Sequence, residues 1–263
     1  MKTRFFAYGD SLTSWCYATH ADLIGTNFDL YYNMGRPGSC NTFIADALFR
    51  DIGVYNFNPD TDFILITTTA LNRFTWYDGN KWIHHGDLDI WYRIADTPDK
   101  IKPFLKHTWN MGWAIQRTFF SIRAIKNILT SLKIPHKIIE GLEMKSFITY
   151  PEEFNLTDFD IDCLKKTFEC IEPYQSIDLF FRYHNNIDCL SYSIEDGEYD
   201  RHPTQYVYLD YIKKYLPEFY TDRALELHEK TFEDYFKKDY QNKLARKLAY
   251  EKFLTENYPN FLW

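Results

Sequence analysis

The sequence predicts a three-layer α/β/α fold around a central parallel sheet of about five strands. Short apolar runs alternate with helical stretches along the chain, and this order favours parallel strands joined by crossover helices. Residues 63–68 (FILITT) are β-branched and nearly continuously apolar, as expected of a strand that is covered on both faces. Apolar residues make up 45% of the 263 residues, enough for a sizeable core.

Four apolar runs have the length of buried strands and are bounded by turn residues. They cover residues 3–8, 28–34, 63–68 and 137–141. A fifth strand is expected around residues 179–181, where Leu-Phe-Phe forms another short apolar run. These five runs account for the predicted sheet.

The segments between the strands have apolar residues at helical spacing. Helices are expected from Thr13 or Ser14 to about residue 24, and over 41–52, 111–132, 158–171 and 204–216. Thr13 or Ser14 would supply the first N-cap, and Gly25 the stop. Pro135 and Pro217 follow two of the later helices, where a proline cannot continue the helix.

Two stretches fall outside this alternation. Residues 74–112 are rich in tryptophan and keep no regular period, so we expect an insertion, with a hairpin, over the end of the sheet. Residues 221–263 are charged and helical, and we expect a C-terminal helical extension suited to self-association or to binding a partner. The predicted α/β domain therefore covers residues 1–220.

Charge and apolar patterning exclude several classes of function. The net charge is −7 and no long basic run occurs, so nucleic-acid binding is not expected. No apolar stretch reaches the ~20 residues of a membrane span. The apolar run at residues 5–8 is too short for a signal peptide, which makes the cytoplasm the expected location.

Metal binding has little support in the sequence. The five cysteines are odd in number and include no C-x-x-C pair, which disfavours a disulfide framework and a zinc knuckle. His84 and His85 lie near Asp87 and Asp89 in one segment, but no second segment supplies further ligands to complete a metal site. A solvated loop is the better interpretation.

Three residues follow the first three predicted strands directly. The first apolar run ends in Gly9-Asp10-Ser11, which is how a buried strand delivers a serine to the end of a sheet. Gly38 and Asn72 follow the second and third strands. Ligands of such folds bind beyond the carboxyl ends of the strands, so Ser11, Gly38 and Asn72 are expected in one site. The acidic side chain of Asp10 is expected to hold the turn through hydrogen bonds.

A serine hydroxyl becomes a nucleophile when a base takes its proton. Asp200 and His202 lie two residues apart in a predicted loop, where alternate side chains of extended backbone point the same way. Asp200 is therefore expected to orient His202, with Glu198 and Asp196 as further candidate acids.

A tetrahedral intermediate also needs hydrogen-bond donors for its oxyanion. The backbone N–H groups of Ser11 and Gly38 and the side-chain amide of Asn72 are the candidate donors. Arg36 and Arg73 lie beside this expected site, and Trp76 lies in the insertion; all three are candidate substrate contacts. Ion pairs for the arginines and core packing for the tryptophan are equally consistent with the sequence.

Four motifs resemble the conserved blocks of the SGNH, or GDSL, hydrolase family. They are Gly9-Asp10-Ser11-Leu12, Asn33-x-Gly35-x-x-Gly38, Leu71-Asn72-Arg73 and Asp200-x-His202-Pro203, and they occur in the family's order. The resemblance covers residues 5–216. It implies a flavodoxin-like fold and an esterase that works through an acyl-enzyme, without metal or organic cofactor. It also implies Ser11, His202 and Asp200 as catalytic residues, and Ser11, Gly38 and Asn72 as the oxyanion hole.

Two positions depart from the family pattern. The third block usually reads G-x-N-D, and Arg73 stands here in place of the aspartate. The last block usually has its aspartate three residues before the histidine, where this chain has Tyr199. A narrower likeness to members encoded by bacteriophages implies a virion-associated setting as an alternative location.

The family spans several activities, which leaves three hypotheses. The aromatic insertion favours hydrolysis of a short acyl or O-acetyl ester, for which a carbohydrate is the expected alcohol. The second hypothesis is a catalytically silent protein in which the fold serves binding or structure. The third is an acyltransferase that passes the acyl group to an acceptor other than water.

Overall fold

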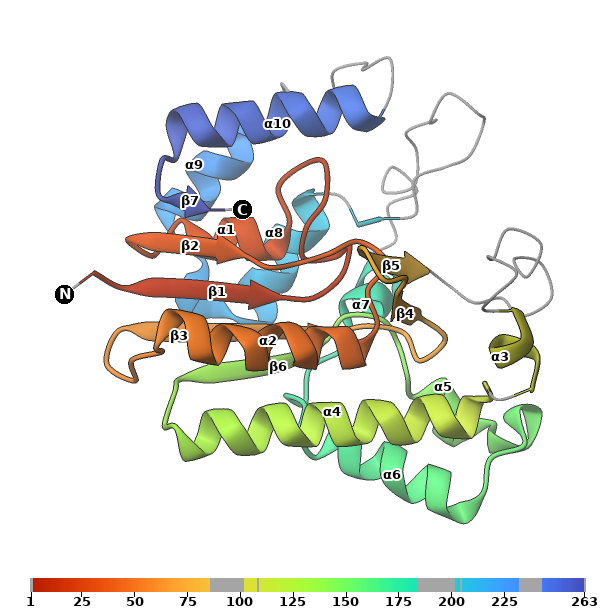
Figure 1. The fold of residues 1–263 in the computed structure, drawn as a ribbon. Coiled ribbons are helices and arrows are strands. Elements are labelled where there is room, and N and C mark those ends of the chain that lie inside the picture. Colours follow the sequence, from red (N-terminus) through yellow and green to blue (C-terminus); the bar gives the residue numbers. More distant parts are fainter. Residues whose placement is uncertain are drawn as a thin grey trace.

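The computed structural model describes residues 2–85, 102–107, 109–183, 202–203, 205–231 and 243–262. Figure 1 shows the arrangement of the helices and strands. In chain order they are β1 (Arg4–Tyr8), α1 (His20–Gly25), β2 (Leu30–Asn33), α2 (Asn41–Tyr55), β3 (Asp62–Thr68), β4 (Phe74–Tyr77), β5 (Trp82–His85), α3 (Lys102–His107), α4 (Met111–Ser131), β6 (His136–Glu140), α5 (Ser146–Thr149), α6 (Asp158–Phe168), α7 (Ile177–Tyr183), α8 (Gln205–Tyr215), α9 (Asp222–Thr231), α10 (Lys243–Asn257) and β7 (Phe261–Leu262).

Within the described residues, the main sheet has five strands in the order β6-β3-β1-β2-β7, and all neighbouring pairs are parallel. β1 lies in the centre, between β2 and β3. The chain therefore builds outward from β1 in both directions, and the carboxyl ends of β1, β2 and β3 open on one edge. In an open parallel sheet, this point of reversal is where ligands bind.

Both faces of the sheet are covered by helices, as Figure 1 shows. Successive side chains of β1 alternate between the faces. Phe5 and Ala7 pack in the core formed with α1, α7, α8, α9 and α10. Phe6 and Tyr8 pack in the core formed with α2, α4 and α6. The predicted three-layer α/β/α fold with a buried parallel sheet is confirmed.

Four predicted strands are confirmed as β1, β2, β3 and β6, but the expected strand at residues 179–181 is wrong. That run lies inside α7, where the N–H of Leu179 bonds the hydroxyl of Ser176 and the N–H of Phe180 bonds the Ser176 carbonyl. A three-residue apolar run cannot separate strand from helix, and the serine cap decides for the helix here. The fifth strand is instead β7, which pairs with β2.

The predicted start of the first helix is also wrong. α1 begins at His20, and Thr19 is its N-cap. The carboxylate of Asp22 accepts a hydrogen bond from the N–H of Thr19 at 2.8 Å, which completes a capping box. Thr13 and Ser14 belong to a turn around Asp10, so the chain covers residues 9–19 as a loop before the helix starts.

The insertion begins with the antiparallel hairpin β4–β5, and residues 86–101 lie outside the described residues. The stretch predicted as a helical extension, residues 221–263, contains α9 and α10 together with β7. Tyr250, Leu254 and Phe261 of this stretch are buried in the same core as Phe5. In the described part of the chain, no helix combines the length and the apolar character needed to cross a membrane.

Candidate active site

The turn that carries Ser11 is organised by Asp10. One carboxylate oxygen of Asp10 accepts the N–H of Leu12 at 2.9 Å, and its carbonyl accepts the N–H groups of Thr13 and Ser14 at 3.1 Å. Ser11 therefore follows β1 directly at the carboxyl edge of the sheet. Its side chain is largely enclosed, with 4% of the residue exposed.

The other carboxylate oxygen of Asp10 binds two groups from the segment after β3. It accepts the Thr69 hydroxyl at 2.7 Å and the Arg73 guanidinium at 2.5 Å. The Asp10 side chain is fully buried, and that of Arg73 is 10% exposed. A buried carboxylate of this kind needs a paired cation, and Arg73 supplies it. Arg73 thus holds the turn of the candidate nucleophile through Asp10.

The loop after β2 wraps around the same turn. The N–H of Arg36 and the hydroxyl of Ser39 both donate to the carbonyl of Gly9, at 3.0 and 3.1 Å. Gly38 lies between them with φ of 80°, a left-handed conformation that side chains with a Cβ rarely adopt. The structure therefore brings Gly38 to the turn of Ser11 and explains why the position is a glycine.

Asn33, at the end of β2, bonds both the loop after β1 and the loop after β2. Its amide nitrogen donates to the Thr13 carbonyl at 3.0 Å and to the Asp22 carboxylate at 3.2 Å, and its amide oxygen accepts the N–H of Gly35. Burial raises the pKa of Asp22 to about 6, against the opposing effect of hydrogen bonds from Thr19 and its neighbours. Asn33 and Asp22 thus fix the loop backbones without taking part in the site itself.

Asn72 lies at the carboxyl edge of β3, in a segment that is fixed to α2. The side chain of Asn41 bonds both the carbonyl and the N–H of Thr69, each at 2.8 Å. The amide oxygen of Asn72 is buried and has no hydrogen-bond partner among the described residues. Buried polar groups are nearly always bonded, so this acceptor without a partner distinguishes Asn72 from Asn33 and Asn41, whose amides hold the loops.

His202 contacts the loop that carries Ser11. Its imidazole stacks on the indole of Trp15, with ring centroids 3.5 Å apart and an interplanar angle of 24°. The Tyr17 hydroxyl donates to the carbonyl of Pro203 at 3.0 Å. The eleven-residue loop after β1 therefore contains the candidate nucleophile and also contacts the segment of the candidate base. Asp200, Glu198 and Asp196 lie outside the described residues.

A second histidine, His20, also lies beside this loop but has a different environment. It is fully buried, and its Nε2 lies 2.9 Å from the Thr67 hydroxyl. Burial lowers its pKa to about 3, against a smaller opposing effect of the Leu12 backbone. His20 is therefore neutral near pH 7 and belongs to the core, whereas His202 is only half-buried.

The candidate substrate contacts occupy different environments. Arg36 is exposed and donates to the carbonyl of Gly35, while Arg73 is engaged with Asp10. Trp76 is 8% exposed and stacks on Phe74 with centroids 5.9 Å apart, so its ring packs inside the insertion. Trp109 is equally buried.

The interpretation of His84 and His85 as a solvated loop is wrong, because both belong to strand β5. Nδ1 of His84 lies 3.2 Å from the Thr75 hydroxyl, and its ring contacts Phe43 edge to face. Burial lowers the pKa of His84, and the charge of Arg36 lowers it further. Asp87 and Asp89 lie outside the described residues. Within the described ranges, no group of three acidic, histidine or cysteine side chains is placed to hold a metal ion.

The structure adds residues to the site that the motifs did not indicate. Trp15 and Tyr17 contact the segment of His202, and Thr69 binds Asp10. These contacts join segments far apart in the chain, so no local spacing points to them. The one signal in the sequence is the dense run of polar and aromatic residues after Ser11, which is unusual for a segment that packs in the core.

Comparisons with known proteins add little to this geometry. The sequence matches no protein-family model, and no curated protein is detectably similar to it. Among solved structures, a GDSL-like lipase from Bacteroides thetaiotaomicron aligns over 96% of this chain and 89% of its own, at 13% identity and a TM-score of 0.33. A similarity of this size carries no argument about the fold or about an activity.

Proposed function

We propose that the chain is a serine ester hydrolase of the SGNH type, which cleaves a short acyl or O-acetyl ester through an acyl-enzyme. One observation carries the proposal: the loop after β1 contains Ser11 and also contacts His202 through Trp15. Gly38 and Asn72 lie at the same edge of the sheet, in loops bonded to Gly9 and to α2. A nucleophile, a base and oxyanion donors thus come from four separate segments of the chain.

In this mechanism, the Ser11 hydroxyl attacks the ester carbonyl while the imidazole of His202 takes its proton. The oxyanion accepts hydrogen bonds from the N–H groups of Ser11 and Gly38 and from the Asn72 amide. Collapse of the intermediate expels the alcohol, which receives the proton from His202. Water then attacks the acyl-enzyme by the same route, and the acid leaves with Ser11 restored. We assign Asp200 to orienting the imidazole.

The test replaces Ser11 with alanine and measures turnover of p-nitrophenyl acetate. We expect Ser11→Ala to lower kcat by at least about a thousandfold, because the acyl-enzyme cannot form without the proposed nucleophile. Ser14→Ala in the same turn is the matched control, and it should retain turnover within a few-fold. Circular dichroism checks that both variants are folded.

Covalent labelling gives an independent readout of the same proposal. A fluorophosphonate probe should label the wild-type protein on Ser11, located by mass spectrometry of the modified peptide, and should not label Ser11→Ala. Full turnover of p-nitrophenyl acetate by folded Ser11→Ala contradicts the mechanism.

The enclosure of Ser11, with 4% exposed, favours a second candidate function, in which the fold serves binding and the serine is silent. In that case the folded wild-type protein shows neither labelling nor turnover. An acyltransferase is the third candidate, and it differs in the product. Mass spectrometry of reactions with and without a sugar acceptor separates transfer from hydrolysis.

A further inference from the structure

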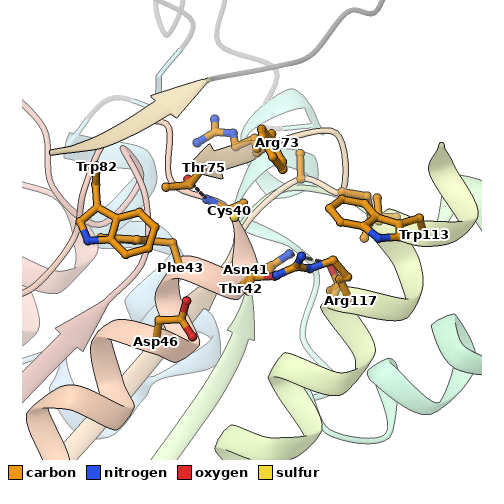
Figure 2. Close-up of a pocket in the computed structure, with 15 residues that line it drawn as sticks. Cys40, Asn41, Thr42, Phe43, Asp46, Arg73, Thr75, Trp82, Trp113 and Arg117 are labelled. Atoms are coloured by element: carbon orange, nitrogen blue, oxygen red, sulfur yellow. Dashed lines mark hydrogen bonds between the residues drawn. The ribbon is translucent and has the colours of Figure 1, made fainter. Parts of the chain in front are cut away.

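A pocket opens beside the candidate active site, between the first turns of α2 and α4 and next to the hairpin β4–β5. Figure 2 shows the residues that line it. The pocket shares two loops with the site, the one after β2 and the one after β3. Cys40 follows the loop of Gly38, Leu71 precedes Asn72, and Arg73 lines the pocket while its guanidinium binds Asp10. A ligand in this pocket would therefore lie next to the proposed oxyanion donors.

Two tryptophans stand on opposite sides of the pocket, as Figure 2 shows. Trp82 from β5 is 43% exposed, and Phe43 supports it edge to face with centroids 5.2 Å apart. Trp113 from α4 is covered on its ring by the Arg117 guanidinium at 4.7 Å. Both indoles are thus held in place by neighbouring side chains, and the exposed area of Trp82 is left for a ligand.

Two opposite charges lie between these aromatic side chains. Asp46 comes from α2 and Arg117 from α4, and both line the pocket. The Arg117 charge acts on the Asp46 carboxyl, since burial raises the pKa of Asp46 and Arg117 opposes this rise. Across the described ranges, neither side chain forms an ion pair within 4.0 Å. A strong acceptor and a planar donor are therefore both open to a ligand.

This combination selects the chemistry of the ligand. A saccharide ring offers a C–H face that can stack on an indole and an edge of hydroxyls that can bond a carboxylate and a guanidinium. A plain acyl chain would bury both charges without replacing their water, which costs free energy. An anionic ligand would be attracted by Arg117 and repelled by Asp46, and a cationic ligand the reverse, so the pair favours neither net charge.

We propose that the pocket lined by Trp82, Trp113, Asp46 and Arg117 binds a neutral saccharide ring, the alcohol part of the ester that Ser11 cleaves. The inference rests on the proposed hydrolase activity for the role of the saccharide, but binding itself can be measured without turnover. The acyl group would then extend past Arg73 toward Ser11.

Binding is tested with the full chain carrying Ser11→Ala, so that no ester is consumed. The probes are neutral xylotetraose, chitotetraose and maltotetraose, and an acidic galacturonate tetramer, each titrated by calorimetry and by tryptophan fluorescence. We expect at least one neutral probe to bind. Adding Trp82→Ala or Arg117→Ala should weaken that binding by about tenfold or more.

Two matched variants control for general effects of substitution. Phe120→Ala removes another exposed aromatic ring, and Arg123→Ala removes another exposed arginine, both from α4 and outside the pocket. Both should bind the probe with unchanged affinity. Binding that is equally strong in Trp82→Ala overturns the proposal, as does preference for the acidic tetramer or failure of every neutral probe to bind.

Failure of this proposal can be told apart from failure of the proposed function. Ser11-dependent turnover of p-nitrophenyl acetate without binding of any neutral probe overturns the saccharide pocket and leaves the hydrolase standing. Binding that depends on Trp82, in a protein without Ser11-dependent turnover, supports the pocket and rejects the hydrolase.

Discussion

Two turns of this molecule are each built around an aspartate, and they differ in what surrounds the carboxylate. Asp78 in the β4–β5 turn accepts two backbone N–H groups at 2.8 and 2.9 Å, in a part of the hairpin that faces solvent. Asp10 also accepts backbone N–H, but it is fully buried and binds Thr69 and Arg73 as well. In both turns an aspartate carboxylate accepts backbone N–H groups, but one turn is buried beside Ser11 and the other is exposed at the end of the hairpin. Tertiary partners set how rigid each turn is.

The largest expected effect is a loss of stability, caused by a substitution that breaks the Asp10 turn. Asp10→Ala removes the buried carboxylate that binds the Arg73 guanidinium, and we expect a loss of about 3–5 kcal/mol in the free energy of unfolding. Asp78→Ala loses hydrogen bonds at an exposed turn, at about 1 kcal/mol. Urea denaturation followed by circular dichroism measures both.

The double variant Asp10→Ala/Arg73→Leu identifies the cause of that loss. If the stranded charge accounts for it, the double variant should be more stable than Asp10→Ala alone. Equal losses for Asp10→Ala and Asp78→Ala would show that the buried ion pair adds nothing to the turn.

A third aspartate extends the comparison, because Asp22 is buried and forms no ion pair with any of the described residues. Among the described residues it is bonded by Thr19, Tyr31 and Asn33, none of which is charged at neutral pH, and burial raises its pKa to about 6. Between about pH 4 and about pH 6, the folded state holds a proton that the unfolded state has released. The contribution of Asp22 to stability is therefore greatest at the acidic end of this window and falls as the pH rises.

The measurement compares the wild-type protein with Asp22→Asn at several pH values. The free energy of unfolding of the wild type, relative to the variant, should fall by about 1–3 kcal/mol from about pH 4 to about pH 6. The difference between the two proteins cancels other groups, including His20, whose lowered pKa acts in the opposite direction. A difference that is constant with pH would place the pKa of Asp22 near its ordinary value.

Substitutions at two glycines include the smallest expected effect. A Cβ on Gly9 would overlap the Thr13 hydroxyl and lie 2.9 Å from the Thr13 Cβ, so Gly9→Ala should cost about 1–3 kcal/mol of stability. Gly53 in α2 has nothing within 4 Å of an added Cβ, and Gly53→Ala should gain about 0.5–1 kcal/mol. Thermal unfolding measures both changes in stability. If the turn beside Ser11 is closely packed, Gly9→Ala lowers the stability and Gly53→Ala raises it.

Much of the sheet could be predicted because its strands are continuous apolar runs of sufficient length. Parallel pairing then places Ser11, Gly38 and Asn72 at one edge, since each lies within five residues of the end of its strand. β7 could not be predicted in this way, because two residues within a charged stretch carry no periodic signal. The start of α1 was missed because Thr13 and Ser14 resemble N-caps but are held by Asp10.

The surroundings of the site depend on contacts between distant segments. The stacking of Trp15 on His202 and the ion pair of Asp10 with Arg73 join residues that no local pattern relates. The pocket likewise combines α2, α4 and the hairpin, which meet only after the sheet has formed. The motifs therefore indicate which residues to examine, and tertiary packing decides what each side chain contacts.

The position of β7 has a consequence for handling the protein. The strand covers the edge of β2, and Asn260 donates to the carbonyl of Phe28 across 232 residues of sequence. A chain shortened before residue 260 would leave the N–H and C=O groups of β2 open to strands of other molecules, which promotes aggregation. Pairing over such a separation also slows folding. Truncation or a rigid fusion near residue 262 therefore risks insoluble protein even when the site near Ser11 is untouched.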